Sequence, residues 1–175
     1  MRILGINDKR DYLISDKEYV RKSARVIVIE NNKIYLAHSK KDYYYKLPGG
    51  GVDKNETKKG AASRECLEES GVRTNADELK FYGVYIDKWK SVRKNEDNII
   101  WVNKSYYYIG KRIGDLENIK PTESEIFAEY ESALVDIDVA IKANEKFINS
   151  ESYNSKYRGL ERENYIFKLI KEELV

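Results

Sequence analysis

Apolar residues come in two short, dense runs near the start of the chain, at 25–30 and 33–39. Both runs are rich in β-branched and aromatic residues, and they flank Asn31-Asn32, a pair that tolerates the positive φ angles of a tight turn. This pattern predicts a β-hairpin. Further on, three consecutive glycines at 49–51 let the backbone approach other backbone, or a ligand, closely.

Other segments show the alternation of apolar and polar residues that is typical of strands. A short extended run is expected at 43–47, and period-two alternation over 79–89 and 99–111 predicts two long strands joined by a polar loop. The segment 110–124 is polar and aperiodic, so we expect a long loop there, of the kind that is often functional. A further short strand is predicted at 134–137.

Three segments carry the spacing and end signals of helices. The first follows a cap at Asn55 or Thr57 and ends at Gly71, a good left-handed terminator. The second begins with Asp138 as its cap. The third spans 157–174 and places its apolar residues on one stripe. The predicted fold class is therefore α/β.

The composition points to an unusual core. Hydrophobic residues make up 41% of the 175 residues, but this share includes 15 tyrosines, while charged residues reach 35%. Typical globular proteins have about 25% charged residues. We therefore expect a core that depends on tyrosine, a densely charged surface and a single domain over 1–175, a length that suits one core.

Charge and cysteine content exclude several classes of function. Lys and Arg (32) nearly balance Asp and Glu (30), so the net charge of +2 creates no broad field for stable nucleic-acid binding. One Cys and one His exclude an internal disulfide and a multi-ligand zinc or iron–sulfur site. Any metal site must use carboxylates. No apolar run is long enough to span a bilayer, and no secretory segment is seen, so we expect a cytoplasmic protein without a membrane partner.

Three glutamates gather on one face of the first helix. At 100° per residue, Glu65, Glu68 and Glu69 fall within an arc of about 100°. Like charges at these spacings oppose helix formation by about 0.2–0.5 kcal/mol per pair, and a bound divalent cation would reverse that effect. A solvated acidic face is the alternative interpretation for three glutamates taken alone.

The surrounding residues favour the metal site. The fixed positions Gly50, Glu56, Arg64, Glu65, Glu68, Glu69 and Gly71 have a spacing that resembles the Nudix box, the signature of the Nudix hydrolase family. Cys66 occupies a position where the box has an aliphatic residue, and it is the one deviation from the pattern. The resemblance extends to 47–52 and to 134–138, and it leaves an N-terminal extension (1–21) and the C-terminal helix (157–174) outside the matched region.

The resemblance implies a Nudix-type α/β/α sandwich with a mixed central β-sheet. It also implies a hydrolase that acts on an acid anhydride, cleaving the diphosphate bond of a nucleotide by attack of water on phosphorus. Glu65, Glu68 and Glu69 are then the ligands of Mg²⁺, with Mn²⁺ as a substitute, because hard cations prefer oxygen ligands. Arg64 is expected to orient a ligand carboxylate.

Substrate contacts and the general base are harder to place. Gly50 and Gly51 are expected to offer backbone donors to phosphate, and Lys46 to touch it. One box glutamate, Glu68 or Glu69, can take the proton from the attacking water, assisted by a glutamate of a later loop. Candidates for the latter are Glu123, Glu125 and Glu129, of which we select Glu125.

The substrate follows only by elimination. The proline of many ADP-ribose hydrolases and the tyrosine of dinucleoside polyphosphate hydrolases would both fall near Trp89, and both are missing. This leaves a MutT-like nucleoside triphosphate pyrophosphatase as our interpretation. The family often forms dimers, so a homodimer is one candidate for the oligomeric state, which the sequence leaves open. A non-catalytic nucleotide sensor and an RNA-end pyrophosphohydrolase are the alternatives.

Overall fold

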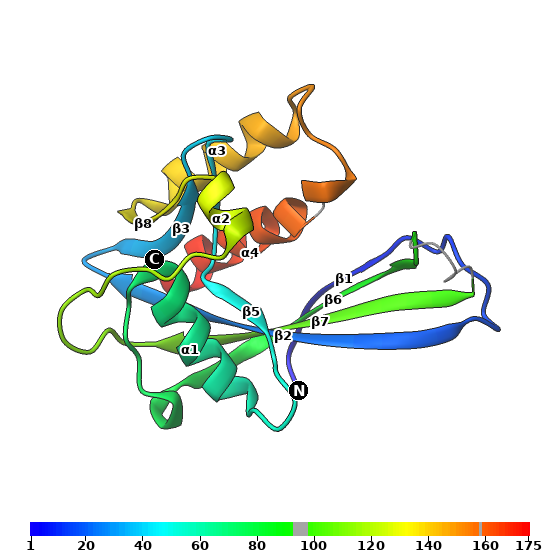
Figure 1. Cartoon of the computed structure of the whole chain (residues 1–175), viewed down its shortest axis with the longest axis horizontal. Coiled ribbons are helices and arrows are strands. Elements are labelled where there is room, and N and C mark those ends of the chain that lie inside the picture. The colour runs from blue at the N-terminus through cyan, green and yellow to red at the C-terminus, as the bar shows by residue number, and fades with distance from the viewer. Residues whose placement is uncertain (93–97, 158) are drawn as a thin grey trace.

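The structure is a computed structural model that describes residues 1–92, 98–157 and 159–175. The strands are β1 (Ile3–Asp8), β2 (Lys17–Glu30), β3 (Lys33–Ser39), β4 (Tyr44–Lys46), β5 (Gly49–Gly51), β6 (Lys80–Lys90), β7 (Ile99–Gly110) and β8 (Tyr130–Val135) (Figure 1). The helices are α1 (Lys58–Ser70), α2 (Glu123–Phe127), α3 (Ile137–Ile148) and α4 (Gly159–Leu174), with 3₁₀ turns at Ala76–Glu78 and Ser155–Tyr157. Part of the polar loop expected between the two long strands, and one residue near the expected start of the last helix, lie outside the described residues.

The strands form one mixed sheet in the order β1-β6-β7-β2-β3-β4, with β5 paired to β2 and β8 to β3. The pairs β1–β6 and β2–β7 are parallel, and the other pairs are antiparallel. The predicted hairpin is present, because Glu30 pairs with Lys33 and the φ angles of Asn31 and Asn32 are 51° and 58°. The expected mixed sheet is confirmed.

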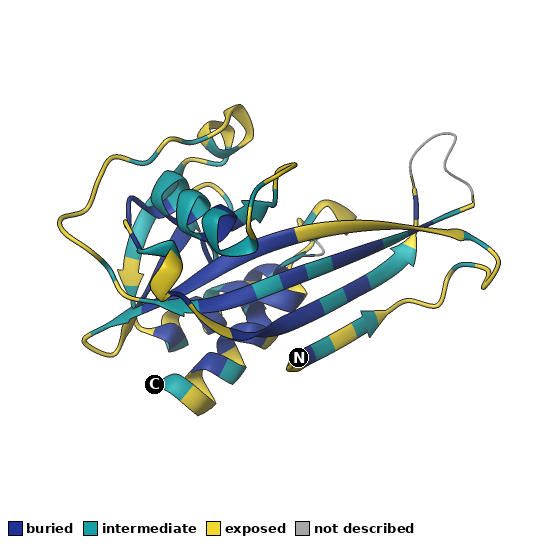
Figure 2. Ribbon diagram, turned by 90° about the horizontal axis from the view of Figure 1, so that it is seen from below, coloured by how far each residue is buried: buried dark blue, intermediate teal, exposed yellow. Residues whose placement is uncertain are grey.

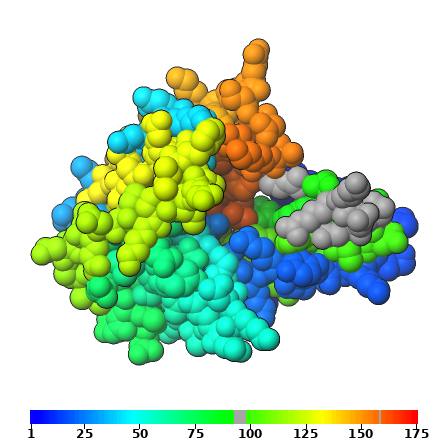
Figure 3. All heavy atoms as spheres, in the orientation of Figure 1, coloured from blue at the N-terminus to red at the C-terminus, as the bar shows by residue number. Residues whose placement is uncertain are grey.

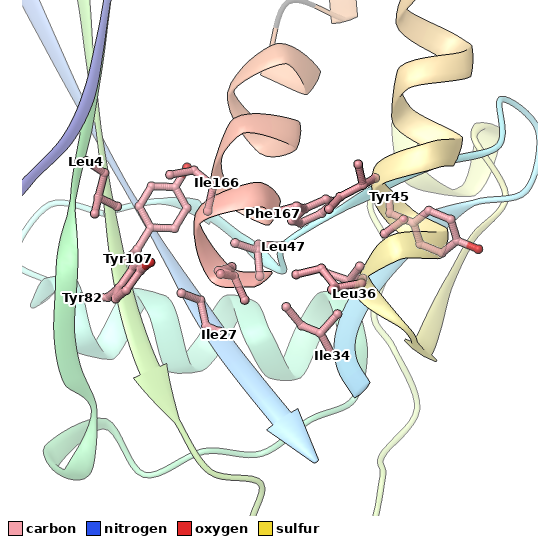
Figure 4. Close-up of a cluster of buried hydrophobic side chains, with 14 of the residues drawn as sticks. Leu4, Ile27, Ile34, Leu36, Tyr45, Leu47, Tyr82, Tyr107, Ile166 and Phe167 are labelled. Atoms are coloured by element: carbon pink, nitrogen blue, oxygen red, sulfur yellow. The ribbon is translucent and has the colours of Figure 1, made fainter. Parts of the chain in front are cut away.

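Alternate side chains of β2 enter two separate cores, because successive residues of a strand point to opposite faces. Val26 and Val28 pack against α1, in a cluster that includes the fully buried Cys66. Ile27 packs on the other face, where Ile166 of α4 belongs to a cluster shared with α3 (Figure 4). Helices thus cover both faces of the sheet, and the α/β/α arrangement is confirmed.

The first helix begins and ends where its signals place it. Thr57, one of the two predicted caps, accepts a hydrogen bond from the Gly60 N–H at 3.0 Å. Gly71 ends the helix in the left-handed region with φ 67°, and its N–H donates to the Leu67 carbonyl. A side chain at Gly71 would also collide with the Glu117 carbonyl, which lies 2.0 Å from the position of an added Cβ.

Glu117 belongs to the loop predicted at 110–124, which folds back along the end of α1. The Glu117 N–H donates to the Gly71 carbonyl at 2.8 Å, and the Lys120 N–H donates to the Glu68 carbonyl at 2.7 Å. These two backbone bonds fix the entry of the short helix α2 beside α1. The sequence predicted the loop but not the helix that follows it, because five residues are too few to show a helical period.

Three predicted boundaries are wrong. The late strand β8 lies at 130–135 and not at 134–137, because its pairing with β3 runs from Ser39–Tyr130 to Ile34–Val135. The cap of α3 is Asp136, whose carboxylate accepts the Asp138 N–H at 2.8 Å, so Asp138 itself lies in the first turn. The last helix begins at 159, after a 3₁₀ turn.

The two ends of the chain join the same sheet and core. The segment 1–21, expected as an extension, contributes β1 and the first part of β2. Beyond the helices, β1, β2, β6 and β7 continue as an arm whose outer edge, residues 17–22 of β2, is exposed (Figure 2). Helix α4 begins over the base of this arm (Figure 1).

Candidate active site

Arg64 holds three carboxylates at one end of the glycine strand β5. Its Nη1 donates to Glu65 Oε1 at 2.8 Å and to Glu68 Oε2 at 3.0 Å, while Nε and Nη2 donate to Glu56, each at 3.0 Å. Bonding to Glu56 raises the pKa of Arg64 and lowers the pKa of Glu56. Arg64 therefore has the geometry of an orienting residue, as predicted, and contacts more carboxylates than a simple helix ion pair would.

Glu56 also ties the preceding loop to the helix. Its Oε2 accepts the Asp53 N–H at 3.2 Å, in addition to the bonds from Arg64. Glu56 therefore links the loop after β5, the start of α1 and Arg64.

Glu69 points to a different side of the site. Its Oε2 accepts the Gly49 N–H at 2.8 Å, and its carboxyl is hydrogen-bonded to that of Glu125. Burial is the main cause that raises the pKa of Glu69 to about 7. A hydrogen bond between two carboxyl groups requires one proton, and the raised pKa places that proton on Glu69.

Helix α2 positions Glu125, the later glutamate that we selected. Glu125 Oε2 accepts the Thr122 N–H at 2.7 Å and the Thr122 hydroxyl at 2.8 Å, which closes a capping box. Burial acts to raise the pKa of Glu125, but the bonds from Thr122 and Glu69 outweigh it and lower the pKa. The other two candidates, Glu123 and Glu129, are exposed.

Gly50 is required by the close approach of Glu65. A Cβ added at Gly50 would lie 2.5 Å from the Glu65 carboxyl carbon, whereas one added at Gly51 would meet only the Arg21 guanidinium at 3.6 Å. Burial is the main cause that raises the pKa of Glu65. The glycine strand therefore forms one wall around this carboxylate.

We expect Gly50→Ala to displace the Glu65 side chain without unfolding the protein, since a carboxylate at the end of a flexible side chain can move. The kcat of nucleotide hydrolysis should fall by about 10²-fold, because moving a reacting group by about 1 Å can lower the rate by that factor. Gly51→Ala should cause a smaller loss, because it meets an ordinary contact. Equal kcat values for the two variants in a pyrophosphate-release assay would contradict the proposed wall.

Lys46 lies beside the Glu69–Glu125 pair. A hollow of about 420 Å³, here called the near hollow, is lined by Lys46, Tyr44 and Glu125. The Lys46 ammonium lies 4.6 Å from the ring centroid of Tyr130. Its positive charge opposes the effect of burial on Glu69 and favours ionised Glu125. The structure thus brings Lys46 to the carboxylates, as the predicted phosphate contact requires.

A second hollow, here called the middle hollow, shares Tyr44 and Lys46 with the first and has a volume of about 220 Å³. Lys156 also lines both hollows. Figure 3 shows α4 at the bottom of a recess between α2 and β2. Sequence reasoning missed Lys156, because it lies after the helix that follows the last predicted strand, in a segment without a recognisable motif.

A buried ion network supports the segment in front of the glycines. Arg25 Nη1 donates to the Leu47 and Gly49 carbonyls at 3.0 and 2.9 Å. Glu163 accepts the Leu47 N–H at 3.1 Å and pairs with both Arg25 and Arg162. The sequence held a signal for this network, since Glu163 interrupts the apolar stripe of the last helix.

The donor set fits a hard divalent cation. Within the described residues, no group of three His, Cys, Asp or Glu side chains is arranged as a ready metal site, because Glu65 and Glu68 bond to Arg64. The nearby oxygens are nevertheless carboxylate oxygens, which Glu65, Glu68 and Glu69 supply from one face of α1. Mg²⁺ prefers such ligands.

Cys66 takes no part in this chemistry. Burial is the main cause that raises the pKa of its thiol to about 12. It packs in the core behind α1, as predicted.

None of the helices among the described residues is long and apolar enough to cross a membrane.

Solved structures of other proteins share this fold. The solved structure of a NUDIX hydrolase from Nitrosomonas europaea is 20% identical and has a TM-score of 0.53, over 76% of this chain and 82% of that one. A MutT protein from Bacillus halodurans is 14% identical with a TM-score of 0.50, over 85% and 80% of the two chains. At these identities the likeness concerns the fold. Comparison with curated protein sequences gives no match.

The model of the NUDIX domain family matches residues 20–154. This range contains the glycine strand, helix α1 with Arg64 and its carboxylates, and Glu125. Because the match covers most of the chain and contains Glu56, Glu65, Glu68, Glu69 and Glu125, the protein belongs to the NUDIX family, whose members hydrolyse pyrophosphate bonds in nucleotide substrates.

Proposed function

We propose that the chain is a Mg²⁺-dependent hydrolase that cleaves a phosphoanhydride bond by attack of water on phosphorus. Its substrate is a nucleoside triphosphate, or a nucleoside diphosphate linked to another group. The observation that carries this proposal is the half-buried Glu69–Glu125 carboxyl pair, placed beside Lys46 at a hollow of about 420 Å³.

Glu65, Glu68 and Glu69 would hold the metal ion, either Mg²⁺ or Mn²⁺. When bound, the ion offsets charge on the diphosphate and lowers the pKa of a coordinated water. Arg64 orients the Glu65 and Glu68 carboxylates through its two short bonds, at 2.8 and 3.0 Å. In this arrangement Arg64 is a positioning residue, since it acts through the carboxylates.

Glu125 is the proposed acceptor of the water proton. Its lowered pKa keeps it ionised near neutral pH, and its bonds to Thr122 hold the carboxylate in place. A general base must be both ionised and within reach of the proton that it takes. Lys46, Gly50 and Gly51 are proposed to bind the substrate phosphates, because a lysine and exposed backbone donors suit anionic oxygens.

The test is a panel of nucleoside triphosphates, diphosphates and nucleotide conjugates, incubated with Mg²⁺ in ¹⁸O-labelled water. We expect one product phosphate to carry a single ¹⁸O atom by mass spectrometry, and EDTA to abolish the reaction. Binding of a nucleotide without turnover would instead support the sensor alternative. Turnover restricted to triphosphorylated RNA would support the RNA-end alternative.

A further inference from the structure

A third hollow, with a volume of about 510 Å³, is not lined by any of the box glutamates or by Glu125. We call it the far hollow. It opens between β1 and β6 on one side and the start of α4 on the other, and its lining includes Asn7, Asp87, Trp89, Gly159 and Arg162. This volume lies within the usual range for small-molecule sites, about 300–1,000 Å³.

Much of the far hollow is built from parts of the chain outside the family match. Asn7 comes from β1, and Gly159 and Arg162 come from α4, whereas the family model covers 20–154. The far hollow therefore lies partly outside the range that the family model matches. Features of this kind determine which substrate an enzyme accepts, because the shared domain supplies the chemistry.

The far hollow connects to the proposed catalytic centre. Gly159 and Arg162 line both the far hollow and the middle hollow, and the middle hollow shares Lys46 and Lys156 with the near hollow. Through these shared residues the three hollows adjoin one another in a row from Glu125 to Trp89. An extended ligand with its diphosphate beside Glu125 would enter the far hollow with its other end.

The chemistry changes along this path. Lys46 and Lys156 line both the near and the middle hollow, with their ammonium groups 4.6 and 5.5 Å from the ring centroids of Tyr130 and Tyr157, so this end carries two cations that suit phosphate oxygens. The far hollow has a different lining, because Arg162 is already paired with Asp87 at 2.8 Å and its side chain is only 9% exposed. The two lysines of its lining are paired as well, Lys9 with Glu161 at 3.9 Å and Lys88 with Glu18 at 2.7 Å. The lining also includes the Trp89 ring, which lies parallel to that of Trp101 at an interplanar angle of 13°, and the Asn7 amide, which makes a long bond of 3.5 Å to Asp87.

We propose that the far hollow binds the nucleobase of the substrate, with Trp89 as the stacking ring and the Asn7 amide as a contact to the base edge. An aromatic face suits stacking with any base, and an Asn amide can donate to and accept from a base edge. This inference rests on the proposed function, and it assigns the phosphates to Lys46 and Lys156 and the base to the opposite end.

Kinetics on the full chain test the proposal. For a hydrolysed nucleoside triphosphate, Trp89→Ala should raise KM by about 5- to 150-fold, the range measured for loss of base stacking. The kcat should change much less, because Trp89 is remote from the carboxylates. Trp89→Phe should keep most of the affinity, since it keeps an aromatic face. Phe81→Ala, which removes an exposed ring from the same strand outside the hollow, should leave KM unchanged.

Asn7→Ala provides a second readout that does not depend on the packing of a large ring. It should change the ratio of KM values among triphosphates of the four bases while kcat stays close to that of the wild type. The base site would be overturned if this ratio is unchanged and if folded Trp89→Phe and Trp89→Ala keep the KM of the wild type. The hydrolase proposal would then remain intact.

Calorimetry with the four nucleoside monophosphates separates the two proposals. If the wild type hydrolyses no nucleotide but binds a monophosphate, and Trp89→Ala abolishes that binding, the base site holds and the hydrolase proposal is wrong. If the wild type neither hydrolyses nucleotides nor binds monophosphates, both are wrong.

Discussion

The Glu69→Gln variant is expected to hydrolyse nucleotides with a kcat about 10²–10⁴-fold below that of the wild-type chain, the range for loss of a group that moves protons or charge in the transition state. The substitution keeps a carbonyl oxygen that can accept the Gly49 N–H, now bonded to Glu69 at 2.8 Å. The loss would therefore report the missing carboxylate ligand for the proposed metal ion and not a rearranged loop. Stopped-flow or coupled pyrophosphate assays at saturating substrate measure it.

Glu125→Gln is the companion variant, and it should cause a loss of the same order if Glu125 accepts the water proton. Gln also serves as the third residue of a capping box, so the bonds with Thr122 can persist. Glu123→Gln, two residues earlier and exposed, is the matched control and should retain wild-type kcat. Wild-type kcat in Glu125→Gln would show that Glu125 only caps α2.

Glu163→Gln is expected to lower the free energy of unfolding by about 3–5 kcal/mol, the cost of removing one partner from a buried ion pair. Glu163 is fully buried and pairs with Arg25 and Arg162 at 3.3 and 3.2 Å. Removing its charge leaves two buried guanidinium groups with less compensation. Urea unfolding followed by circular dichroism measures the change.

The matched control is Glu172→Gln, an exposed position on the same helix, which should change stability by less than about 0.5 kcal/mol. Burial acts to raise the pKa of Glu163, but Arg25 and Arg162 outweigh it and lower the pKa. The stabilisation by the charge of Glu163 is thus fully present above the pKa of a glutamate in the unfolded chain, about 4.3. It is lost as the pH falls through the lower pKa that Glu163 has in the folded chain. The stability difference between wild type and Glu163→Gln should shrink below about pH 4, and a pH-independent difference would contradict this origin.

Local signals in the sequence determined the elements that lead to the site. The Asn31-Asn32 turn, the Thr57 cap and the Gly71 stop each act on neighbouring residues, so the hairpin and helix α1 were predicted with their ends. The spacing of Arg64 and the glutamates on that helix follows from its 3.6-residue period. The Nudix box and the family were therefore visible before any tertiary contact.

Only the tertiary structure decided which later glutamate reaches the helix. Glu123, Glu125 and Glu129 are equivalent in sequence, and the selection of Glu125 depends on the loop that bonds to the end of α1 and on the Thr122 capping box. The far hollow and the Arg25–Glu163 network likewise join residues that are more than 100 positions apart. Such contacts arise from the packing of α4 on the sheet, and side-chain spacing along a chain carries information only about neighbours within one helix or strand.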